Sequence, residues 1–528
     1  MMNREDTVMR GRYGRKDALI AVVLAAVTLV LAAGMLDGGH PWSDDFAGYM
    51  LQGRAIAEGC VKEQTQLNLM LHPSRLDFGG DVVEGALVYV WGLPMLLSVV
   101  YRLVGYDMPA GTQLIFYKLP GVLLLAAAAA LAYWFFRRRF SRPVSAVLAA
   151  VLCMGREILV ESTYVQTDVP CMALSLLALL LIEVFLQQRG MGRRVLTGAA
   201  LGAAMWFTCE LRLNGKTVAA VIALAHGLAL LRERPKGRGW LTHAVPWVTM
   251  AVLWGMTRAF LPEATSNTAH IAGGPNWWIL HNIKAYDDVL KDWIMQMLPT
   301  GFPFAEAARF VLYALAVLGM LAHGLRENLH LTVLTLGTFA VVYLLPYFQG
   351  IRYLYNVLPL LLMFAAYGGM LLVDELAKRP AAHRAARAGC GVVLALLILG
   401  TAQNTAHSEA EHLRDGGLSS RYDAYSDEMT DMFANVCENT AEDAVIVFFK
   451  PRLMYLNTGR VGFVPDVGDH AFSEADYVLL TSNPLTDCMR EGMWPELWER
   501  MELVYDNGSF ELYRLAPVQE QDGGMSEP

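Results

Sequence analysis

The chain has 528 residues, 55% of them hydrophobic, and a mean hydropathy of +0.35. Apolar runs recur along most of its length, which predicts a polytopic α-helical membrane protein and excludes a soluble protein with one core. The formal net charge of −8 is unevenly spread, because the chain from His407 onward carries 24 acidic residues against 8 Lys and Arg. No basic groove with interleaved aromatic residues is evident, so we expect no nucleic-acid partner.

The first apolar run, residues 18–36, follows a cluster of Arg and Lys residues, which places the N-terminus in the cytoplasm. The run is long for a signal peptide, so we interpret it as a retained span. The stretch His40–Tyr49 follows directly and holds Asp44 and Asp45 at the mouth of that span. Adjacent carboxylates there are costly unless they face water, a cation or a substrate. The alternative is a helix N-cap beside the membrane interface.

The run at residues 85–104 decides the topology of the chain. If it crosses the membrane, the basic clusters around Arg138, Arg193, Arg234 and Arg384 lie outside, whereas otherwise they lie inside, as the positive-inside rule prefers. We therefore predict an interfacial or re-entrant helix there, 11 spans in total, and an extracytoplasmic C-terminus in the cell membrane. The ten later spans are predicted at residues 114–136, 144–160, 169–187, 196–211, 217–231, 241–260, 307–322, 329–345, 354–373 and 389–401, with a long outer loop at 261–304.

The acidic C-terminal part is predicted to be a separate domain. We expect a transmembrane domain over residues 1–404, a small extracytoplasmic α/β domain over 405–518 and a disordered tail over 519–528. Its sequence has a helical pattern at 422–436, strand patterns at 444–449 and 477–480, and a hairpin pattern at 503–513. Cys437 and Cys488 are its two cysteines, and we leave open whether they pair.

Three cations break the positive-inside pattern, since Arg212, Lys216 and Arg352 lie at the outer ends of apolar spans. A cation in that position is expected to answer an anion, and a lipid phosphate is the natural candidate. The alternative is a side chain that snorkels to the outer headgroups. Asp168 opens a span from the same side and is followed by Pro170. That pattern suits a functional acid, but it also suits a helix start.

The order of span, acidic pair, Tyr49, small-residue helix and glycine resembles the first outer loop of the GT-C glycosyltransferases. The likeness is to the branch of protein mannosyltransferases and aminoarabinose transferases. That branch has an acid four residues before the Tyr, which here is Asp45. The next position is often acidic in relatives, whereas here Phe46 follows and the second acid, Asp44, precedes.

Three other segments carry the same resemblance. Residues 352–359, which begin with Arg-Tyr and end with Pro, are similar to the segment that enters a late span of this branch. Asp168 resembles the acid of its second outer loop. His72-Pro73 is similar to a pair that precedes the interfacial helix in related chains, although the segment after it is longer here.

The resemblance implies an inverting glycosyltransferase that takes a sugar from a polyprenyl-phosphate donor. The acceptor is extracytoplasmic: a protein hydroxyl, a lipid or a cell-envelope glycan. The candidate catalytic residues are Asp45 as general base, Asp44 and Asp168. The candidate ligands of the lipid phosphate and sugar are Arg352, Tyr353, Arg212, Asn214, Lys216, Tyr49 and His72. No cofactor is demanded and no metal cluster is evident, although the paired acids leave a divalent metal open.

Two other classes of protein remain as alternatives. A transporter or flippase of lipid-linked sugars would also place ionisable residues at outer mouths, but it should use charges near the bilayer midplane and show repeat symmetry between its halves. The sequence shows neither feature. A non-catalytic membrane assembly factor would bind lipid without transferring a sugar.

Overall fold

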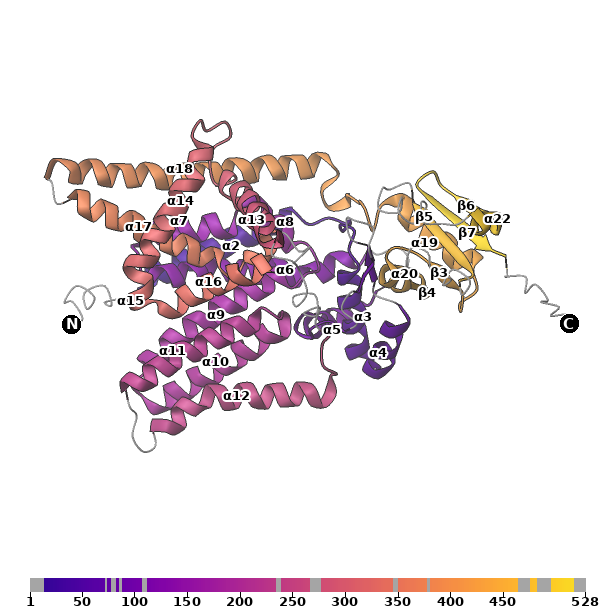
Figure 1. Ribbon diagram of the computed structural model, residues 1–528, viewed down its shortest axis with the longest axis horizontal. Helices are drawn as coiled ribbons and strands as arrows, with labels where there is room; N and C mark the ends of the chain where they lie inside the picture. Colours follow the sequence, from indigo (N-terminus) through magenta and orange to yellow (C-terminus); the bar gives the residue numbers. More distant parts are fainter. Residues whose placement is uncertain are drawn as a thin grey trace.

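The computed structural model describes most of the chain and shows a bundle of helices with a small sheet domain at its C-terminal end (Figure 1). Helices α3, α4 and α5 lie between these two parts (Figure 1). The described residues are 14–71, 74–76, 82–84, 88–106, 112–233, 239–265, 277–344, 350–377, 380–463, 475–481 and 495–516.

The helical part contains long apolar helices joined by short turns. Its helices are α2 (Arg15–Gly34), α3 (Asp45–Glu58), α4 (Val61–Met70), α5 (Gly92–Val104), α6 (Leu114–Arg137), α7 (Arg142–Cys153), α8 (Arg156–Ser162), α9 (Asp168–Gln187), α10 (Met191–Leu211), α11 (Gly215–Glu233), α12 (Gly239–Phe260), α13 (Trp277–Met295), α14 (Ala305–Gly319), α15 (Leu325–Glu327), α16 (Leu329–Leu344), α17 (Leu358–Ala377) and α18 (Pro380–Arg414). Shorter elements are the β1 (Ser74–Leu76) and β2 (Val82–Glu84) hairpin, the π-helical turn η2 (Met320–Gly324) and the 3-10 turn η3 (Ile351–Leu354).

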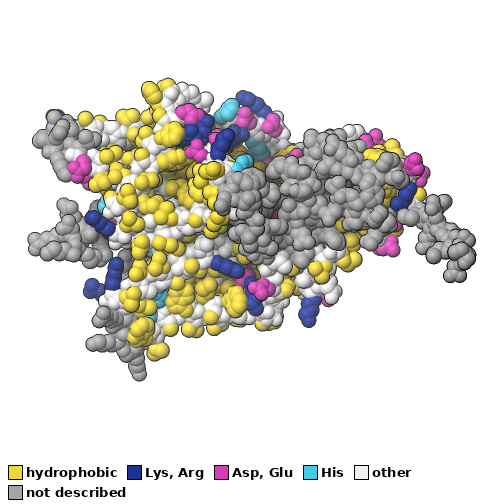
Figure 2. All heavy atoms as spheres, viewed as in Figure 1, with side chains coloured by type: hydrophobic (Ala, Val, Ile, Leu, Met, Phe, Trp, Pro, Cys, Tyr) yellow, Lys and Arg dark blue, Asp and Glu magenta, His cyan; other side chains and the backbone are white. Residues whose placement is uncertain are grey.

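Among the described residues, seven helices are long and apolar enough to cross a membrane, or eight if the bent pair α7 and α8 counts as one span. Large apolar side chains on these helices stay exposed, as Val30 and Leu321 show. Figure 2 shows such side chains spread over the visible face of the helical part, which suits contact with lipid. The prediction of a multi-pass membrane protein with a C-terminal sheet domain is therefore confirmed. The count of 11 spans and the orientation of the termini stay predictions.

Two predicted segments have a different form in the structure. The expected span at 144–160 is two helices bent by 56°, and Gly155 lies at the break. The expected outer loop at 261–304 contains the 19-residue helix α13, in which Tyr286 is fully buried. A helix with one apolar face has no continuous apolar run, and for that reason the sequence pattern concealed it.

Helix α5 lies where the interfacial helix was predicted. It has 13 residues, which span about 20 Å at 1.5 Å per residue, whereas the hydrocarbon core is about 30 Å thick. It packs closely on α3, as Gly53 shows: a Cβ atom added there would lie only 2.9 Å from the Cβ atom of Leu97. The short length suits a helix along the interface, and its placement relative to the membrane stays a prediction.

The C-terminal domain is a five-stranded mixed sheet with helices beside it. The helices are α19 (Asp427–Asn439), α20 (Pro451–Thr458) and α22 (Pro495–Glu499), and the strand order is β4 (Val461–Phe463), β3 (Val445–Val447), β5 (Tyr477–Thr481), β7 (Phe510–Leu515) and β6 (Met501–Asp506). The first three strands are parallel, whereas β7 is antiparallel to both neighbours. Strands β3 and β5 and the β6–β7 hairpin lie where the sequence predicted strands and a hairpin, whereas β4 was not predicted. Cys437 lies in α19, while Cys488 and residues 519–528 lie outside the described residues.

One apolar core joins the segment between α2 and α6, which is the predicted first outer loop, to the C-terminal domain. Phe46 of α3 and Leu93 of α5 belong to the same buried cluster as Phe433 of α19. The Ala424 N–H also donates to the carbonyl oxygen of His40 at 3.1 Å. We call the described residues between α2 and α6, together with the C-terminal domain, the outer unit, after its predicted side of the membrane. Helix α18 runs through the predicted boundary at residue 404 to reach it. The boundary itself stays a prediction.

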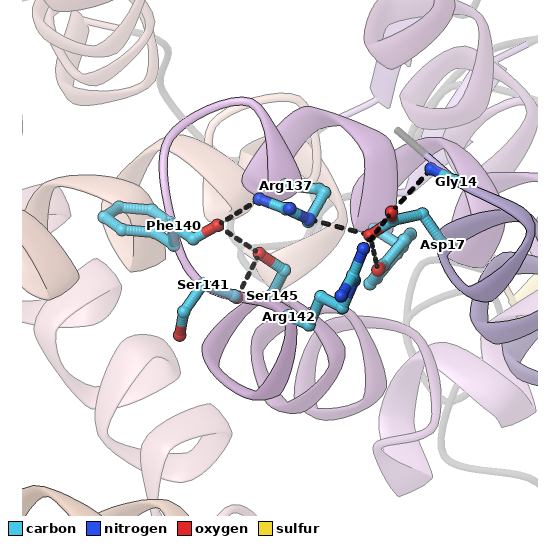
Figure 3. Close-up of polar contacts among 8 residues, drawn as sticks. Gly14, Asp17, Arg137, Phe140, Ser141, Arg142 and Ser145 are labelled. Atoms are coloured by element: carbon cyan, nitrogen blue, oxygen red, sulfur yellow. Dashed lines mark hydrogen bonds and ion pairs between the residues drawn. The ribbon is translucent and has the colours of Figure 1, made fainter. Parts of the chain in front are cut away.

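A group of charged residues, which we call the inner cluster, lies at the N-terminal end of α2, whereas the outer unit begins beyond its C-terminal end. Figure 3 shows the contacts of this group. Asp17 is fully buried and accepts hydrogen bonds from Arg137 Nε at 2.8 Å, from Arg142 Nη2 at 2.8 Å and from the Tyr133 hydroxyl at 2.9 Å. The Gly14 N–H donates to the same carboxylate at 3.0 Å. These contacts tie α2 to α6 and α7.

Candidate functional site

Four separate segments bring most of the predicted site residues together. The start of α3 carries Asp45, the start of α9 carries Asp168, the turn between α10 and α11 carries Arg212, and η3 carries Arg352. The charges of Asp45 and Asp168 act on Arg352, and those of Asp45, Asp168 and Arg212 act on the buried Tyr49. We call Asp45, Tyr49, Asp168, Arg212, Arg352 and Tyr353 the outer cluster.

Asp168 and Arg212 form an ion pair inside the outer cluster. The carboxylate of Asp168 is nearly buried in the first turn of α9, and Arg212 Nη1 lies 2.6 Å from its Oδ1. Arg212 Nη1 also lies 3.4 Å from the hydroxyl oxygen of Thr167, which in turn shares a hydrogen bond with the Tyr49 hydroxyl. These contacts fix the positions of α3, α9 and the end of α10 relative to one another.

Arg352 differs from Arg212 in its partners. Both guanidinium groups lie over the ring of Tyr353, at 5.1 Å and 5.0 Å from its centroid, which is a cation–π distance. Arg352 donates to the Tyr353 hydroxyl at 3.1 Å and to Gln166 Oε1 at 3.4 Å. In the part of the chain that the structure describes, no carboxylate lies within 4.0 Å of Arg352. A half-buried cation without a direct counter-ion favours an anionic ligand.

Asp45 is held from the side of the first outer loop. The hydroxyl of Tyr89 donates to Asp45 Oδ1 at 2.7 Å. The backbone of Tyr89 is fixed by Gln52, whose amide donates to the Tyr89 carbonyl oxygen at 3.1 Å and accepts the Tyr89 N–H at 2.7 Å. Asp45 and Gln52 lie two turns apart on one face of α3, so this helix determines both contacts. Burial raises the pKa of Tyr89 well above its ordinary value, so its hydroxyl keeps the proton that it donates.

Asp44 points to the C-terminal domain instead. Its Oδ1 accepts the backbone N–H groups of Arg452 at 3.0 Å and Leu453 at 3.3 Å, at the start of α20. Burial raises the pKa of the Asp44 carboxyl, and the charges of Arg452 and Lys450 act in the opposite direction. The two adjacent acids therefore contact different parts of the molecule.

Among the described residues, Lys216 and Asn214 make no hydrogen bond or ion pair with the side chains of the outer cluster. The side chain of Lys216 is exposed in the first turn of α11, and among the described residues it has no ion pair. Asn214 Oδ1 accepts a weak contact from Cys171 Sγ at 3.9 Å. His72 lies outside the described residues. Roles for these three residues stay predictions.

Two polar groups beside the outer cluster were missed by sequence reasoning. Glu161 Oε2 and the Tyr355 hydroxyl are buried, and neither has a hydrogen-bond partner in the described structure. The charge of Glu161 acts on both Arg352 and Tyr355. A buried polar atom without a partner costs about 1–3 kcal/mol, so such atoms mark a place for water or a ligand. Glu161 lies one turn beyond Glu157 on α8, and that spacing was the available signal.

The acids of the site do not form a ready cation site. Among the described residues, no three His, Cys, Asp or Glu side chains converge. The α20 backbone engages Asp44, and Arg212 engages Asp168. These contacts leave the question of a divalent metal open.

The sequence matches no family model and no curated protein. The structure, however, matches solved structures. The Archaeoglobus fulgidus oligosaccharyltransferase in complex with Zn and sulfate aligns with a TM-score of 0.56 and 11% identity, over 87% of this chain and 68% of that chain. ArnT from Cupriavidus metallidurans bound to undecaprenyl phosphate aligns with a TM-score of 0.51 and 14% identity, over 93% and 97%. The chain has the GT-C fold.

A further match is to AglB from Archaeoglobus fulgidus in complex with an inhibitory peptide and a dolichol-phosphate, with a TM-score of 0.52 and 10% identity, over 94% of this chain and 74% of that chain. These identities establish the fold alone, and they confirm the GT-C architecture that the sequence predicted. The outer unit lies at one end of the helical bundle (Figure 1). The outer cluster is formed by helix ends and turns rather than by helix centres.

Proposed function

We propose that the protein is an integral-membrane glycosyltransferase that transfers a sugar from a polyprenyl-phosphate donor to an extracytoplasmic acceptor hydroxyl. The observation that carries the proposal is Arg352, a half-buried cation that has no carboxylate within 4.0 Å among the described residues and whose charge interacts with that of Asp45. The GT-C fold supports it, since solved structures of that fold are complexes with undecaprenyl phosphate and with a dolichol-phosphate.

Asp45 is assigned as the general base. Its carboxylate takes the proton from the acceptor hydroxyl while the acceptor oxygen forms a bond to the anomeric carbon. The bond between that carbon and the phosphate oxygen breaks on the opposite face of the sugar, so the anomeric configuration inverts. The hydrogen bond from Tyr89 occupies Asp45 Oδ1 and fixes the direction of the carboxylate.

The two arginines are assigned to the departing lipid phosphate. Negative charge grows on the phosphate as the glycosidic bond breaks, and cations fixed beforehand at that place stabilise the transition state. Arg352 supplies the unmatched charge, whereas Arg212 is already paired with Asp168. Tyr353 holds both guanidinium groups against its ring. Asp168 thereby positions the phosphate-binding side of the site.

Glu161 and Tyr355 are assigned to the hydroxyl groups of the transferred sugar. Glu161 Oε2 offers a buried acceptor and the Tyr355 hydroxyl offers a buried donor and acceptor, both beside Arg352. A sugar hydroxyl can satisfy either group, and the hydrogen bonds would replace those lost to burial.

The proposal is tested with the full-length protein in nanodiscs. Mass spectrometry of envelope glycans and glycoproteins with and without the gene identifies the sugar that is lost. A polyprenyl-phosphate carrier bearing that sugar is then the donor, and we expect release of the lipid phosphate together with a glycosylated acceptor. Movement of the labelled donor across the bilayer without release of lipid phosphate would instead indicate a flippase.

A further inference from the structure

Arg452 of the C-terminal domain lies directly against the residue that holds the proposed base. It is the second residue of α20, and its side chain is 1% exposed. Its Nη1 donates to the Tyr89 hydroxyl at 2.5 Å, and its guanidinium carbon lies 4.8 Å from the centroid of the Tyr89 ring. A buried guanidinium is costly unless it is paired. Two of its partners, Tyr89 and Asp44, belong to the segment between α2 and α6.

Asp44 anchors the helix that carries Arg452. The first N–H groups of a helix lack partners within the helix, and an acid placed there is stabilised by the helix dipole. Asp44 Oδ1 accepts two such groups, from Arg452 and Leu453, while Asp44 Oδ2 lies 3.9 Å from Arg452 Nε. Asp44 therefore fixes the backbone of Arg452 by a hydrogen bond and lies close enough to its guanidinium to offset part of its charge.

The donors and acceptors give the contact a direction. An arginine side chain can donate but cannot accept a hydrogen bond, so the Tyr89 oxygen must be the acceptor of the Arg452 contact. The single hydroxyl proton of Tyr89 is then left to point at Asp45 Oδ1, which lies 2.7 Å away. Arg452 thus determines which way the Tyr89 hydroxyl donates. A hydrogen bond donated to a carboxylate favours its ionised form.

A glycine in α3 makes room for this arrangement. A Cβ atom on Gly48 would lie 2.3 Å from Tyr89 Cε2 and 3.3 Å from Arg452 Cδ. The first distance is too short for any side chain, so the Tyr89 ring would have to move. The position of Tyr89 therefore depends on a glycine that lies one turn after Asp44.

We propose that Arg452 is a positioning residue, which acts through Tyr89 to hold Asp45 ionised and oriented, so that the C-terminal domain completes the catalytic centre. Asp44 serves as the docking anchor of that domain. This inference rests on the proposed function, in which Asp45 is the general base. It concerns the docking contact and adds nothing to the assignment of the lipid phosphate.

Arg460 provides a matched control in the same domain. It is 9% exposed, and among the described residues its guanidinium donates only within the domain, to Thr440 Oγ1 at 3.2 Å and to the carbonyl oxygens of Thr458, Cys437 and Thr440. An Arg460→Lys variant loses hydrogen bonds of a buried guanidinium without touching the first outer loop. It reports what damage to the domain does by itself.

Transfer by full-length Arg452→Ala, Tyr89→Phe and the double variant is measured over about pH 5–9. Each single variant should lower kcat by about 10- to 100-fold, the size expected from one lost charge-assisted hydrogen bond. The acid limb of the pH–rate profile should move to higher pH, and the KM for the donor should change little. The double variant should be no slower than the slower single one, because both break one link. Arg452→Lys, which keeps the charge but not the planar fork, should be intermediate.

Two results would overturn the inference. In the first, Arg452→Ala loses activity only in proportion to its folded fraction, and the acid limb of its pH–rate profile lies at the same pH as that of Arg460→Lys. Arg452 would then have a structural role alone. In the second, the main effect of Arg452→Ala is a raised donor KM, which would mean that Arg452 contacts the phosphate. Amide hydrogen exchange supplies a readout that needs no donor: the first turns of α3 should exchange faster in Arg452→Ala than in Arg460→Lys. If exchange is faster in Arg452→Ala but the wild-type protein shows no transfer activity, the proposed function is refuted and the docking contact is kept. Equal exchange in the two variants would refute the contact.

Discussion

The inner and outer clusters contain the same kinds of residue, but they differ in how their charges are matched. In the inner cluster, both oxygens of Asp17 accept hydrogen bonds, and Arg137 and Arg142 both bind this one carboxylate (Figure 3). In the outer cluster, the hydrogen bonds of Arg352 among the described residues go only to an amide oxygen and a phenol oxygen. The difference indicates that the inner cluster holds helices together, whereas the outer cluster has a charge left for a ligand.

A third buried pair shows that location alone does not make a site. Lys118 of α6 is fully buried at the end of the bundle that meets the outer unit, and it donates to Asp37 Oδ1 at 2.7 Å, to the Asp37 carbonyl oxygen at 3.0 Å and to the Gly39 carbonyl oxygen at 2.6 Å. All three of its protons are therefore used. Lys118 resembles the inner cluster because all of its donors have acceptors, although it lies beside the outer unit.

The largest expected effect comes from the base of the outer cluster. Asp45→Asn keeps the volume of the side chain but removes the base, so transfer should fall by a factor of about 10²–10⁴. Asp44→Asn is the matched neighbour, and it should cost about tenfold or less, because an Asn oxygen can still accept the two N–H groups of α20. Initial rates at matched expression and thermal stability give both values. Near wild-type transfer by Asp45→Asn would show that the outer cluster only holds helices together, as the inner cluster does.

The inner cluster should respond in stability rather than in chemistry. Asp17→Asn leaves Arg137 and Arg142 without their carboxylate. Removing one partner of a buried pair costs about 3–5 kcal/mol, and we expect about 3 from the loss of the Arg137 pair alone, with nothing counted for the exposed Arg142. Thermal unfolding in detergent should show the loss, while the rate per folded molecule stays unchanged. A selective loss of transfer without a lower unfolding temperature would remove the distinction between the two clusters.

A smaller effect is expected from acid at the junction of the outer unit. Burial and the charge of Lys118 lower the pKa of His40 to about 3, and its Nε2 accepts the Val165 N–H at 3.2 Å, so the folded protein holds the ring neutral. Below its ordinary pKa of 6.5 the unfolded chain takes up a proton that the folded chain does not. Stability therefore falls as pH drops from that value towards 3, by about 1.4 kcal/mol per pH unit, or about 2 kcal/mol at about pH 5.

The measurement is the difference in unfolding temperature between about pH 7 and pH 5. His40→Gln should lessen that difference, because the titrating group is gone. His407→Gln, which changes an exposed ring, should leave it as in the wild type. An equal pH dependence in the wild type and His40→Gln would show that another group controls acid sensitivity.

The sequence predicted what local pattern and charge encode, and it missed what only the folded chain brings together. Asp45, Asp168, Arg212 and Arg352 became candidates because they lie at predicted outer ends of apolar spans, and the family resemblance also singled out Asp45, Asp168 and Arg352. The link from Arg452 to Asp45 was missed, since these residues come from opposite ends of the chain and no spacing relates them. Helix α13 was missed for a different reason: polar residues alternate with its apolar residues along the sequence, so the helix has one apolar face but no continuous apolar run.

The adjacent acids illustrate the same limit. Their sequence placed both at one mouth, but the last turn before α3 sends Asp44 towards α20 and Asp45 towards Tyr89. Which of two neighbouring side chains faces a ligand depends on the exact start of a helix. Local pattern does not fix that start to a single residue.

The central claim is that the unmatched charge of Arg352 receives a lipid phosphate, and binding of polyprenyl phosphate to the purified protein tests it most directly. Native mass spectrometry or a radiolabelled-lipid assay in nanodiscs compares the wild type with Arg352→Ala, Asp45→Asn and Asp17→Asn. Wild type, Asp45→Asn and folded Asp17→Asn should bind the lipid alike. Arg352→Ala should bind it at least about tenfold more weakly, the loss expected when a charged hydrogen-bonding partner is removed. Equal binding by Arg352→Ala and the wild type would contradict the account.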